Sequence, residues 1–207
     1  MDLLEKILSA GLEEMNLPAT DHQRRQLVEF LHLLRKWNRV YNLTSIDNTS
    51  DMVGLHLLDS LAILPHLKGK AILDVGTGAG LPGLPLAILS PDKEFTLLDS
   101  NAKKIRFVRQ ASIELGLANV NVAHIRIEQF KSATGFDSIL ARAFAGLVEI
   151  LGQTLRLLNP GGVILAQKGK LPQAEINDLA QVDVNIIPLH VPRIRAERHL
   201  IELKVRS

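Results

Sequence analysis

The sequence predicts an α/β fold in which helices cover both faces of a mostly parallel, seven-stranded sheet, preceded by a helical segment. Three observations indicate this fold. From Ala71 onward, short apolar runs typical of buried strands alternate with helical stretches, which is the pattern of a parallel sheet. Residues 1–66 contain no such run and have helical periodicity instead. The last two runs, 184–189 and 199–205, are joined without a helix, so we expect an antiparallel last strand.

The apolar runs also set the expected boundaries. The strands are expected at 71–75, 95–99, 120–124, 138–143, 163–168, 184–189 and 199–205. The helices between them are expected at 84–89, 101–116, 145–158 and 172–181. These elements together would make one sheet domain, 67–207, with 1–66 as an N-terminal helical extension packed on it.

The composition is that of an ordinary globular protein, and it excludes several kinds of chemistry. With 207 residues, of which 46% are hydrophobic and 22% charged, the chain can bury one full core. It contains no cysteine, which excludes disulfides, thiolate zinc sites and cysteine nucleophiles. No stretch has the pattern of a signal peptide or a membrane span, so we expect a cytoplasmic protein with no membrane partner. The net charge of +2 does not by itself indicate nucleic-acid binding.

The extension is expected to begin with a helix near 3–15. Thr20 and Gln23 then have the spacing of a capping box, which starts a second helix. The apolar stripe of this helix consists of Leu27, Phe30, Leu31, Leu34, Trp37 and Tyr41. Its opposite face, which we interpret as solvent-exposed, carries Arg24, Arg25, Arg35, Lys36 and Arg39.

A third helix is expected to start at Thr49 or Ser50. Within it His56 and Asp59 lie three residues apart and therefore share one side. Two ligands without a third nearby make a poor metal site, and we expect no bound metal. A surface hydrogen bond, or a position facing the glycine-rich loop at 76–83, is the better interpretation of this pair.

A glycine-rich loop follows the first expected strand. Gly76, Gly78, Gly80 and Gly83 come directly after the strand, and an apolar helical stretch follows them. A strand, a glycine-rich turn and a helix form the phosphate-side geometry of a nucleotide-binding crossover. Glycines suit this turn because it needs dihedrals closed to other residues and because a Cβ would meet the ligand.

Two ligands compete for this loop. Residues 78–83 fit the G-x-G-x-x-G of a dinucleotide fold, and residues 74–80 fit the acidic-x-G-x-G-x-G of S-adenosylmethionine (SAM) enzymes. Asp74 favours SAM, because a carboxylate there would repel a pyrophosphate but could bind the methionyl ammonium. Asp99, 19 residues after Gly80, ends the next strand, where either ligand needs an acceptor for the ribose hydroxyls.

A set of motifs resembles one family. The motifs, in chain order, are WNRVYNLTS (37–45), HLLDS (56–60), DVGTGAGLPGLPLAI (74–88), LLDS (97–100), ARAFA (141–145), LAQKG (165–169) and ERHL (197–200). They are similar to the bacterial 16S ribosomal RNA guanine-N7 methyltransferases, the glucose-inhibited division protein B family, over nearly the whole chain. The resemblance implies a Rossmann-like class I SAM-dependent methyltransferase that modifies N7 of a guanine in 16S rRNA of the small ribosomal subunit.

The resemblance also assigns residues. Positions corresponding to cofactor contacts are Gly76 and Leu81 on the loop, Ile127 and Glu128 at the adenine ring, and Arg142 beside cofactor and target base. Positions corresponding to basic residues that face RNA are Lys103, Arg126, Lys168 and Arg198. One departure is Leu55, where many relatives have an arginine, so the role of that arginine does not carry over to this chain.

The residues at the end of the fourth strand fit methylation without a general base. Methylation at C5 of a pyrimidine needs a cysteine, and exocyclic amine methylation usually needs an (Asp/Asn)-Pro-Pro-aromatic turn where this chain has Arg142 and Phe144. Guanine N7 already carries a lone pair, so positioning suffices. We expect Arg142 to bind guanine O6, a phosphate or the cofactor carboxylate, or else to pair with Asp137 or Glu149. Phe144 would stack on the base or pack in the core.

Basic residues gather near the expected C-terminal edge of the sheet. They are Lys168, Lys170, Arg193, Arg195, Arg198, Lys204 and Arg206, and we expect them to form an RNA groove on a monomeric enzyme. Three alternatives remain open at this point. The protein could methylate a small molecule or a protein, it could be a nicotinamide-dependent oxidoreductase, or it could assist ribosome assembly by binding RNA without any chemistry.

Overall fold

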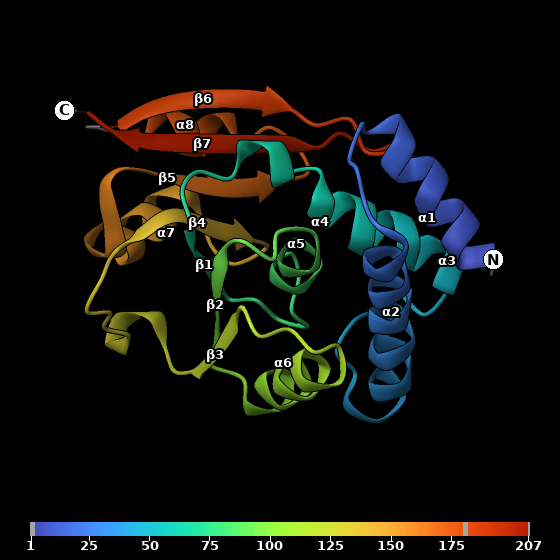
Figure 1. Ribbon diagram of the computed structural model, residues 1–207. Coiled ribbons are helices and arrows are strands. Elements are labelled where there is room, and N and C mark those ends of the chain that lie inside the picture. Colours follow the sequence, from blue (N-terminus) through green and yellow to red (C-terminus); the bar gives the residue numbers. More distant parts are fainter. Residues whose placement is uncertain (1–2, 180–181, 207) are drawn as a thin grey trace.

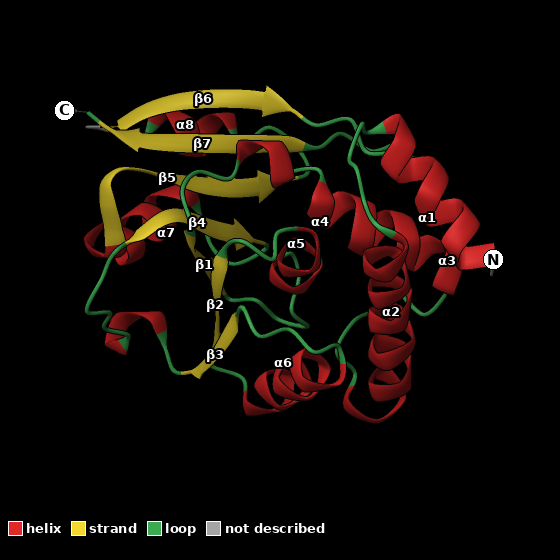
Figure 2. Cartoon of the chain, viewed as in Figure 1, coloured by secondary structure: helices red, strands yellow, loops and turns green. Residues whose placement is uncertain are grey.

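A single seven-stranded sheet forms the centre of the protein (Figures 1 and 2). The computed structural model describes residues 3–179 and 182–206. The strands are β1 (Ala71–Val75), β2 (Glu94–Asp99), β3 (Val120–His124), β4 (Phe136–Arg142), β5 (Leu158–Lys168), β6 (Val182–Pro188) and β7 (His199–Val205). Their order is β3-β2-β1-β4-β5-β7-β6. The first five pair parallel, and β7 runs antiparallel to both β5 and β6, which confirms the predicted fold class.

Helices cover the sheet on both faces. The α-helices are α1 (Leu3–Glu14), α2 (Asp21–Tyr41), α3 (Thr49–Met52), α4 (Asp59–Leu61), α5 (Gly83–Leu89), α6 (Ala102–Glu114), α7 (Leu147–Thr154) and α8 (Gln173–Asn177). A π-helix, η1 (Val53–Leu58), joins α3 to α4, and 3₁₀ turns occur at η2 (Leu64–His66), η3 (Ile127–Gln129) and η4 (Leu155–Leu157). No helix within 3–179 or 182–206 is long and apolar enough to cross a bilayer.

Alternation along the strands divides the core into two layers. Ile72 of β1 faces a layer formed with α1 to α6, whereas its neighbour Leu73 faces a smaller layer that includes α7. Successive strand residues point to opposite faces, so a continuous apolar run is what a sheet covered on both sides requires. The helices of residues 3–66 share the first layer with α5 and α6, and Figure 1 shows α2 beside them.

The predicted capping box is present. The Thr20 hydroxyl accepts from the Gln23 N–H at 3.2 Å, and the Gln23 side chain accepts from the Thr20 N–H at 2.9 Å. Satisfying these two otherwise unpaired donors fixes the start of α2. The helix ends at Tyr41, and the next residue, Asn42, caps it with a left-handed φ of 50°.

Several expected boundaries are wrong. The expected helix at 145–158 ends earlier, because η4 follows α7 and β5 already begins at Leu158. Strand β5 extends through a bulged, irregular stretch before the regular pairing with β4 resumes at Val163. The helix expected at 172–181 is the short α8, and residues 180–181 lie outside the described residues.

The third helix of the extension also differs from the expectation. It begins at Thr49 as predicted, but its middle is the π-helix η1, a rare conformation found frequently at functional sites. His56 and Asp59 are 4% and 5% exposed, so they are not surface residues. Asp59 lies beside Arg142 and Gln167 at the carboxyl ends of β4 and β5.

Candidate functional site

The glycine-rich loop connects β1 to α5. Gly76, Gly78 and Gly80 have φ angles of +67°, +60° and +79°, a left-handed region that strongly favours glycine. At Gly76 a Cβ would in addition overlap the ring of Phe144. The glycines therefore set the path of the loop, and Gly76 also lets the end of β4 pack directly against it.

Asp74 supports this loop from below. Its Oδ2 accepts from the Thr77 hydroxyl at 2.6 Å and from the Gly83 N–H at 3.0 Å. Asp74 is only 1% exposed. Burial raises the pKa of Asp74 to about 6, although the hydrogen bonds from Thr77 and Gly83 and the positive charge of Arg142 act to lower it. The Asp74 carboxylate therefore lies beneath the loop and joins its two ends through Oδ2, while its Oδ1 has no hydrogen-bond partner among the described residues.

Asp99, at the end of β2, joins the loop to α6. Its Oδ2 accepts from the Gly78 N–H at 2.9 Å, and its Oδ1 accepts from the Asn101 N–H at 2.8 Å. Asn101 in turn caps α6. A carboxylate oxygen can accept more than one hydrogen bond, so Asp99 retains capacity for a ligand hydroxyl.

A cavity of about 360 Å³ opens beside these residues. Its lining consists of Gly76, Leu98, Asp99, Ser100, Lys104, Ile125, Arg126, Ile127, Glu128, Ala143 and Phe144. The sequence singled out six of them: Gly76, Asp99, Arg126, Ile127, Glu128 and Phe144. Among the other expected cofactor contacts, Asp74, Gly78, Gly80, Leu81 and Arg142 lie outside this lining. Lys104 was missed, although its place in the first turn after the LLDS motif could have indicated it.

The end of β4 forms one wall of the cavity. Ala143 has a φ of 49°, which is uncommon for a residue other than glycine and costs energy. This turn brings the half-buried ring of Phe144 against Gly76. Phe144 therefore packs on the loop while also lining the cavity.

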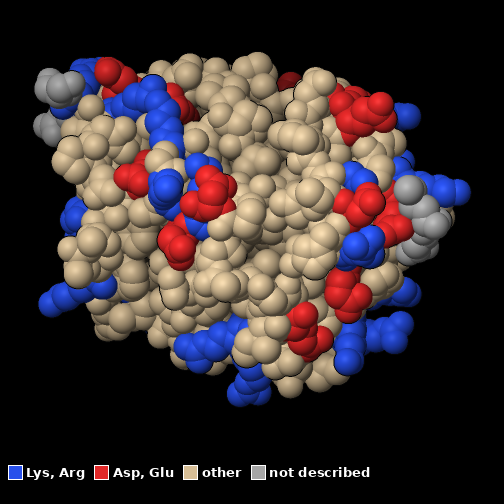
Figure 3. Space-filling model, viewed as in Figure 1, with Lys and Arg blue, Asp and Glu red and all other residues tan. Residues whose placement is uncertain are grey.

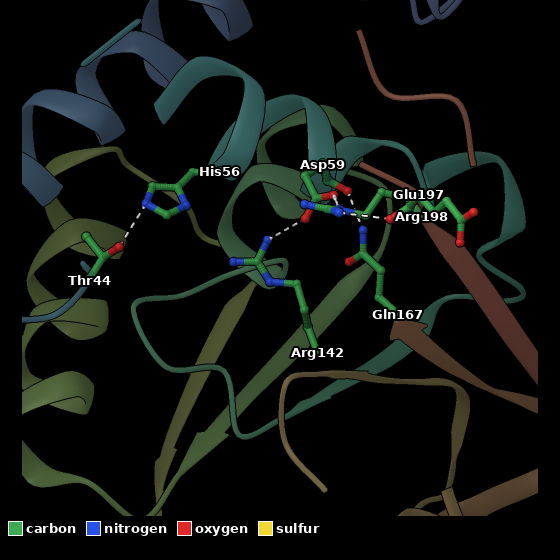
Figure 4. Close-up of polar contacts among 7 residues, drawn as sticks. All are labelled: Thr44, His56, Asp59, Arg142, Gln167, Glu197 and Arg198. Carbon is green, nitrogen blue, oxygen red and sulfur yellow. Dashed lines mark hydrogen bonds and ion pairs between the residues drawn. The ribbon is translucent and has the colours of Figure 1, made fainter. Parts of the chain in front are cut away.

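Arg142 binds Asp59, not the expected Asp137 or Glu149. An Nη of Arg142 lies 3.0 Å from Asp59 Oδ2, and Nε of Arg198 lies 2.8 Å from Asp59 Oδ1 (Figure 4). Gln167 donates through Nε2 to the Asp59 carbonyl at 2.6 Å. One buried carboxylate thus holds two arginines, one from the end of β4 and one from the loop before β7.

Two buried side chains beside Asp59 keep unpaired atoms. Gln167 Oε1 and His56 Nδ1 have no hydrogen-bond partner among the described residues. His56 Nε2 lies 3.1 Å from the Thr44 hydroxyl. Burial lowers the pKa of His56 to about 4, and the charge of Arg142 acts in the same direction, so the ring is neutral at pH 7.

The four expected RNA-facing residues have different surroundings. Lys103 is exposed, and Arg126 lines the cavity. Lys168 donates to the Ala145 carbonyl at 3.0 Å and pairs with Glu175 at 3.2 Å, and Arg198 is held by Asp59. On the face shown in Figure 3, basic side chains are largely interspersed with acidic ones.

The loop before β7 lies close to Leu55, the residue that stands where many relatives have an arginine. A hollow of about 250 Å³ there is lined by Ser50, Asp51, Gly54, Leu55, Arg193, Ile194, Arg195, Ala196 and Arg198. Three of the expected RNA-groove arginines are therefore gathered around Leu55. Lys204 and Arg206 of the same group pair instead with Glu202 and Asp183.

The chain is similar to known proteins over nearly its whole length. The chain is 58% identical over 199 residues to the ribosomal RNA small subunit methyltransferase G of Methylococcus capsulatus, covering 96% of this chain and 97% of that protein. It is 50% identical over 204 residues to the protein of the same name from Nitrosococcus oceani, covering 98% and 95%.

Solved structures show the same fold in more distant proteins. A SAM-dependent methyltransferase from Aquifex aeolicus aligns with a TM-score of 0.58 at 18% identity, covering 79% of this chain and 97% of that one. A tRNA (uracil-54, C5)-methyltransferase from Pyrococcus abyssi, in complex with S-adenosyl-L-homocysteine, aligns with a TM-score of 0.55 at 21% identity, covering 76% and 39%. The family model GidB, described as rRNA small subunit methyltransferase G, matches residues 23–201, so the chain belongs to this family.

Proposed function

We propose that this protein transfers the methyl group of SAM to N7 of a guanine in 16S rRNA of the small ribosomal subunit. The observation that carries this proposal is the cavity formed where the glycine-rich loop, Asp99 and the end of β4 meet, in a chain of the GidB family. Ligands of open α/β sheets bind at this carboxyl edge of the strands. Two proteins of similar fold contain S-adenosyl-L-homocysteine, which supports SAM as the cofactor.

The residues of the cavity fit SAM. Gly76 presents no side chain to the ligand, and Asp99 offers acceptors for the ribose hydroxyls. Leu98 and Ile127 provide apolar surface for an adenine ring, and Glu128 offers an acceptor for its amine. The volume lies within the usual range of small-molecule sites, about 300–1,000 Å³. When bound here, SAM supplies an electrophilic methyl group. The other loop residues, Asp74, Gly78, Gly80 and Leu81, contribute by fixing the shape of the loop.

The chemistry requires alignment more than proton transfer. Guanine N7 attacks with its own lone pair, so no group has to remove a proton, and alignment can supply roughly 7–11 kcal/mol. Phe144 stands at the cavity wall, where stacking on the base would contribute roughly 1–3 kcal/mol. Arg142 is held by Asp59 through one of its nitrogens, and its remaining donors can bind guanine O6 or a phosphate. A bond from Arg142 to N7 would block the nucleophile.

The RNA would lie across the carboxyl edge of the sheet. Lys103, Arg126, Lys168 and Arg198 are the proposed contacts. Lys168 and Arg198 already have internal partners, but a lysine has three donors and an arginine five, so each can bind RNA without releasing its partner.

A methyl-transfer assay tests the proposal. Labelled SAM is incubated with the protein and with either naked 16S rRNA or purified small subunits, and the modified nucleotide is then mapped. We expect label at guanine N7 in 16S rRNA. RNA binding without label would indicate an assembly factor, and label on a small molecule or protein only would indicate another methyltransferase. S-adenosylhomocysteine, but not a nicotinamide cofactor, should raise the melting temperature, because only a ligand of the folded state stabilises it.

A further inference from the structure

A second polar hollow lies at the C-terminal end of α2. It measures about 670 Å³ and is lined by Arg35, Asn38, Arg39, Asn42, Thr44, Ser45 and Asp47. Two arginines face a single carboxylate there, so the hollow carries a net positive charge. The sequence predicts that the basic side chains of this helix form a solvent-exposed face, but two of them, Arg35 and Arg39, line this hollow.

Arg35 and Arg39 are four residues apart and therefore lie on the same side of α2. Both are exposed, and neither has an ion pair within residues 3–179 or 182–206. A cation in the last turn of a helix complements the helix dipole, which accounts for Arg39. This effect fades beyond the last turn, so it does not account for Arg35.

The floor of the hollow is ordered by a buried side chain. Asn38 is 6% exposed, and its Oδ1 accepts from the Thr44 N–H at 2.8 Å while its Nδ2 donates to Asp47 Oδ1 at 2.7 Å. The Thr44 hydroxyl also accepts from the Ile46 N–H at 3.2 Å. Because this loop is fixed before any ligand arrives, binding would cost little ordering entropy.

A row of polar side chains leads from the hollow to the proposed site. Thr44 lies 3.1 Å from His56, and the charge of Arg142 acts on His56. Arg142 is bonded to Asp59, which holds Arg198 on its other oxygen. Figure 4 shows these side chains in a row, with Thr44 at one end and Arg198 at the other. A strand placed over Arg142 would therefore have basic side chains on both sides of the target.

We propose that Arg35 and Arg39 bind backbone phosphates of the RNA strand beside the target guanine, making the helical extension part of the RNA-binding surface. This inference rests on the proposed function. Flexible single-stranded RNA fits the hollow because phosphates suit the two guanidinium groups, whereas the polar floor offers donors and acceptors to sugar hydroxyls.

The test compares two double variants that lose the same charge from the same helix. R35A/R39A removes the arginines of the hollow, and R25A/K36A removes two exposed basic side chains outside it. The readouts are the KM for small subunits, the salt dependence of binding to a 16S rRNA fragment, and the affinity for S-adenosylhomocysteine. We expect R35A/R39A to raise KM about tenfold and to reduce the salt slope by about 1.4, the value for two phosphates of a single strand. R25A/K36A should change KM less than about twofold, and R35K/R39K should retain most of the affinity.

Several results would overturn this inference. Equal losses in the two double variants would indicate a general effect of charge, and no loss in R35A/R39A would exclude the contact. A parallel fall in affinity for S-adenosylhomocysteine would show that the substitutions act through the fold. If the wild-type protein transfers no methyl group to 16S rRNA, the proposed function fails, whereas the binding titration still decides whether this hollow contacts RNA.

Discussion

Replacing Asp59 by asparagine tests the centre of the proposed site. The substitution keeps the shape of the side chain but removes the negative charge that Arg142 and Arg198 share. Breaking a fully buried ion pair from one side costs about 3–5 kcal/mol. Here the arginine side chains are 21% and 19% exposed, against 7% for Asp59, so water retains part of their solvation. We therefore expect a loss of about 2–3 kcal/mol, or roughly 4–12 °C in Tm for a chain of this size.

Urea unfolding of D59N measures this loss. D183N is the matched control, because Asp183 and Arg206 form an exposed ion pair with side chains 69% and 62% exposed, for which we expect about 0–1 kcal/mol. A double-mutant cycle of D59N with R198A should give a coupling energy of about 1 kcal/mol or more. A loss below about 0.5 kcal/mol in D59N, the range of ordinary surface changes, would refute the reasoning. Methyl transfer by D59N should fall in kcat/KM, with the affinity for S-adenosylhomocysteine less affected.

Three further predictions concern the loop, the buried histidine and the RNA face. G76A should bind S-adenosylhomocysteine at least tenfold more weakly by calorimetry, because a Cβ at a φ of +67° would overlap Phe144; unchanged binding would remove the loop from the site. The pKa of His56 lies below its usual value, at about 4, so its contribution to stability is present above pH 6.5 and is lost as the pH falls toward 4. The difference in unfolding free energy between wild type and H56Q should therefore drop by about 2 kcal/mol from pH 7 to pH 5, and a constant difference would contradict the burial of the ring. K168A should weaken binding of 16S rRNA without changing affinity for S-adenosylhomocysteine, whereas intact activity would favour a substrate other than RNA.

Local patterns in the sequence predict much of this protein. The central strands appear as short apolar runs because a sheet covered on both faces buries most of their residues. The capping box at Thr20 and Gln23 and the left-handed glycines of the loop depend on residues only a few positions apart, so their chemistry is visible without the fold. The family motifs in addition indicate residues at the carboxyl edge of the sheet, such as Asp99 and Arg142.

Other features depend on contacts that a local pattern does not contain. The start of β5 reads as a loop because Pro160, Gly161 and Gly162 disfavour a strand, yet pairing with β4 extends β5 back to Leu158. The π-helix η1 has no distinct sequence period, so the sequence left open whether His56 and Asp59 lie on the helix surface or face the glycine-rich loop.

The sequence by itself determined the order of the elements, the glycine-rich loop and six of the residues that line the cavity. Only the tertiary structure decided which of them meet. Asp59 binds Arg142 and Arg198, which are 83 and 139 residues away along the chain, and Asp74 turns beneath the loop. The physical reason is that a buried charge is costly unless it is paired, and only the packing of the whole chain decides which residue of opposite charge lies beside it.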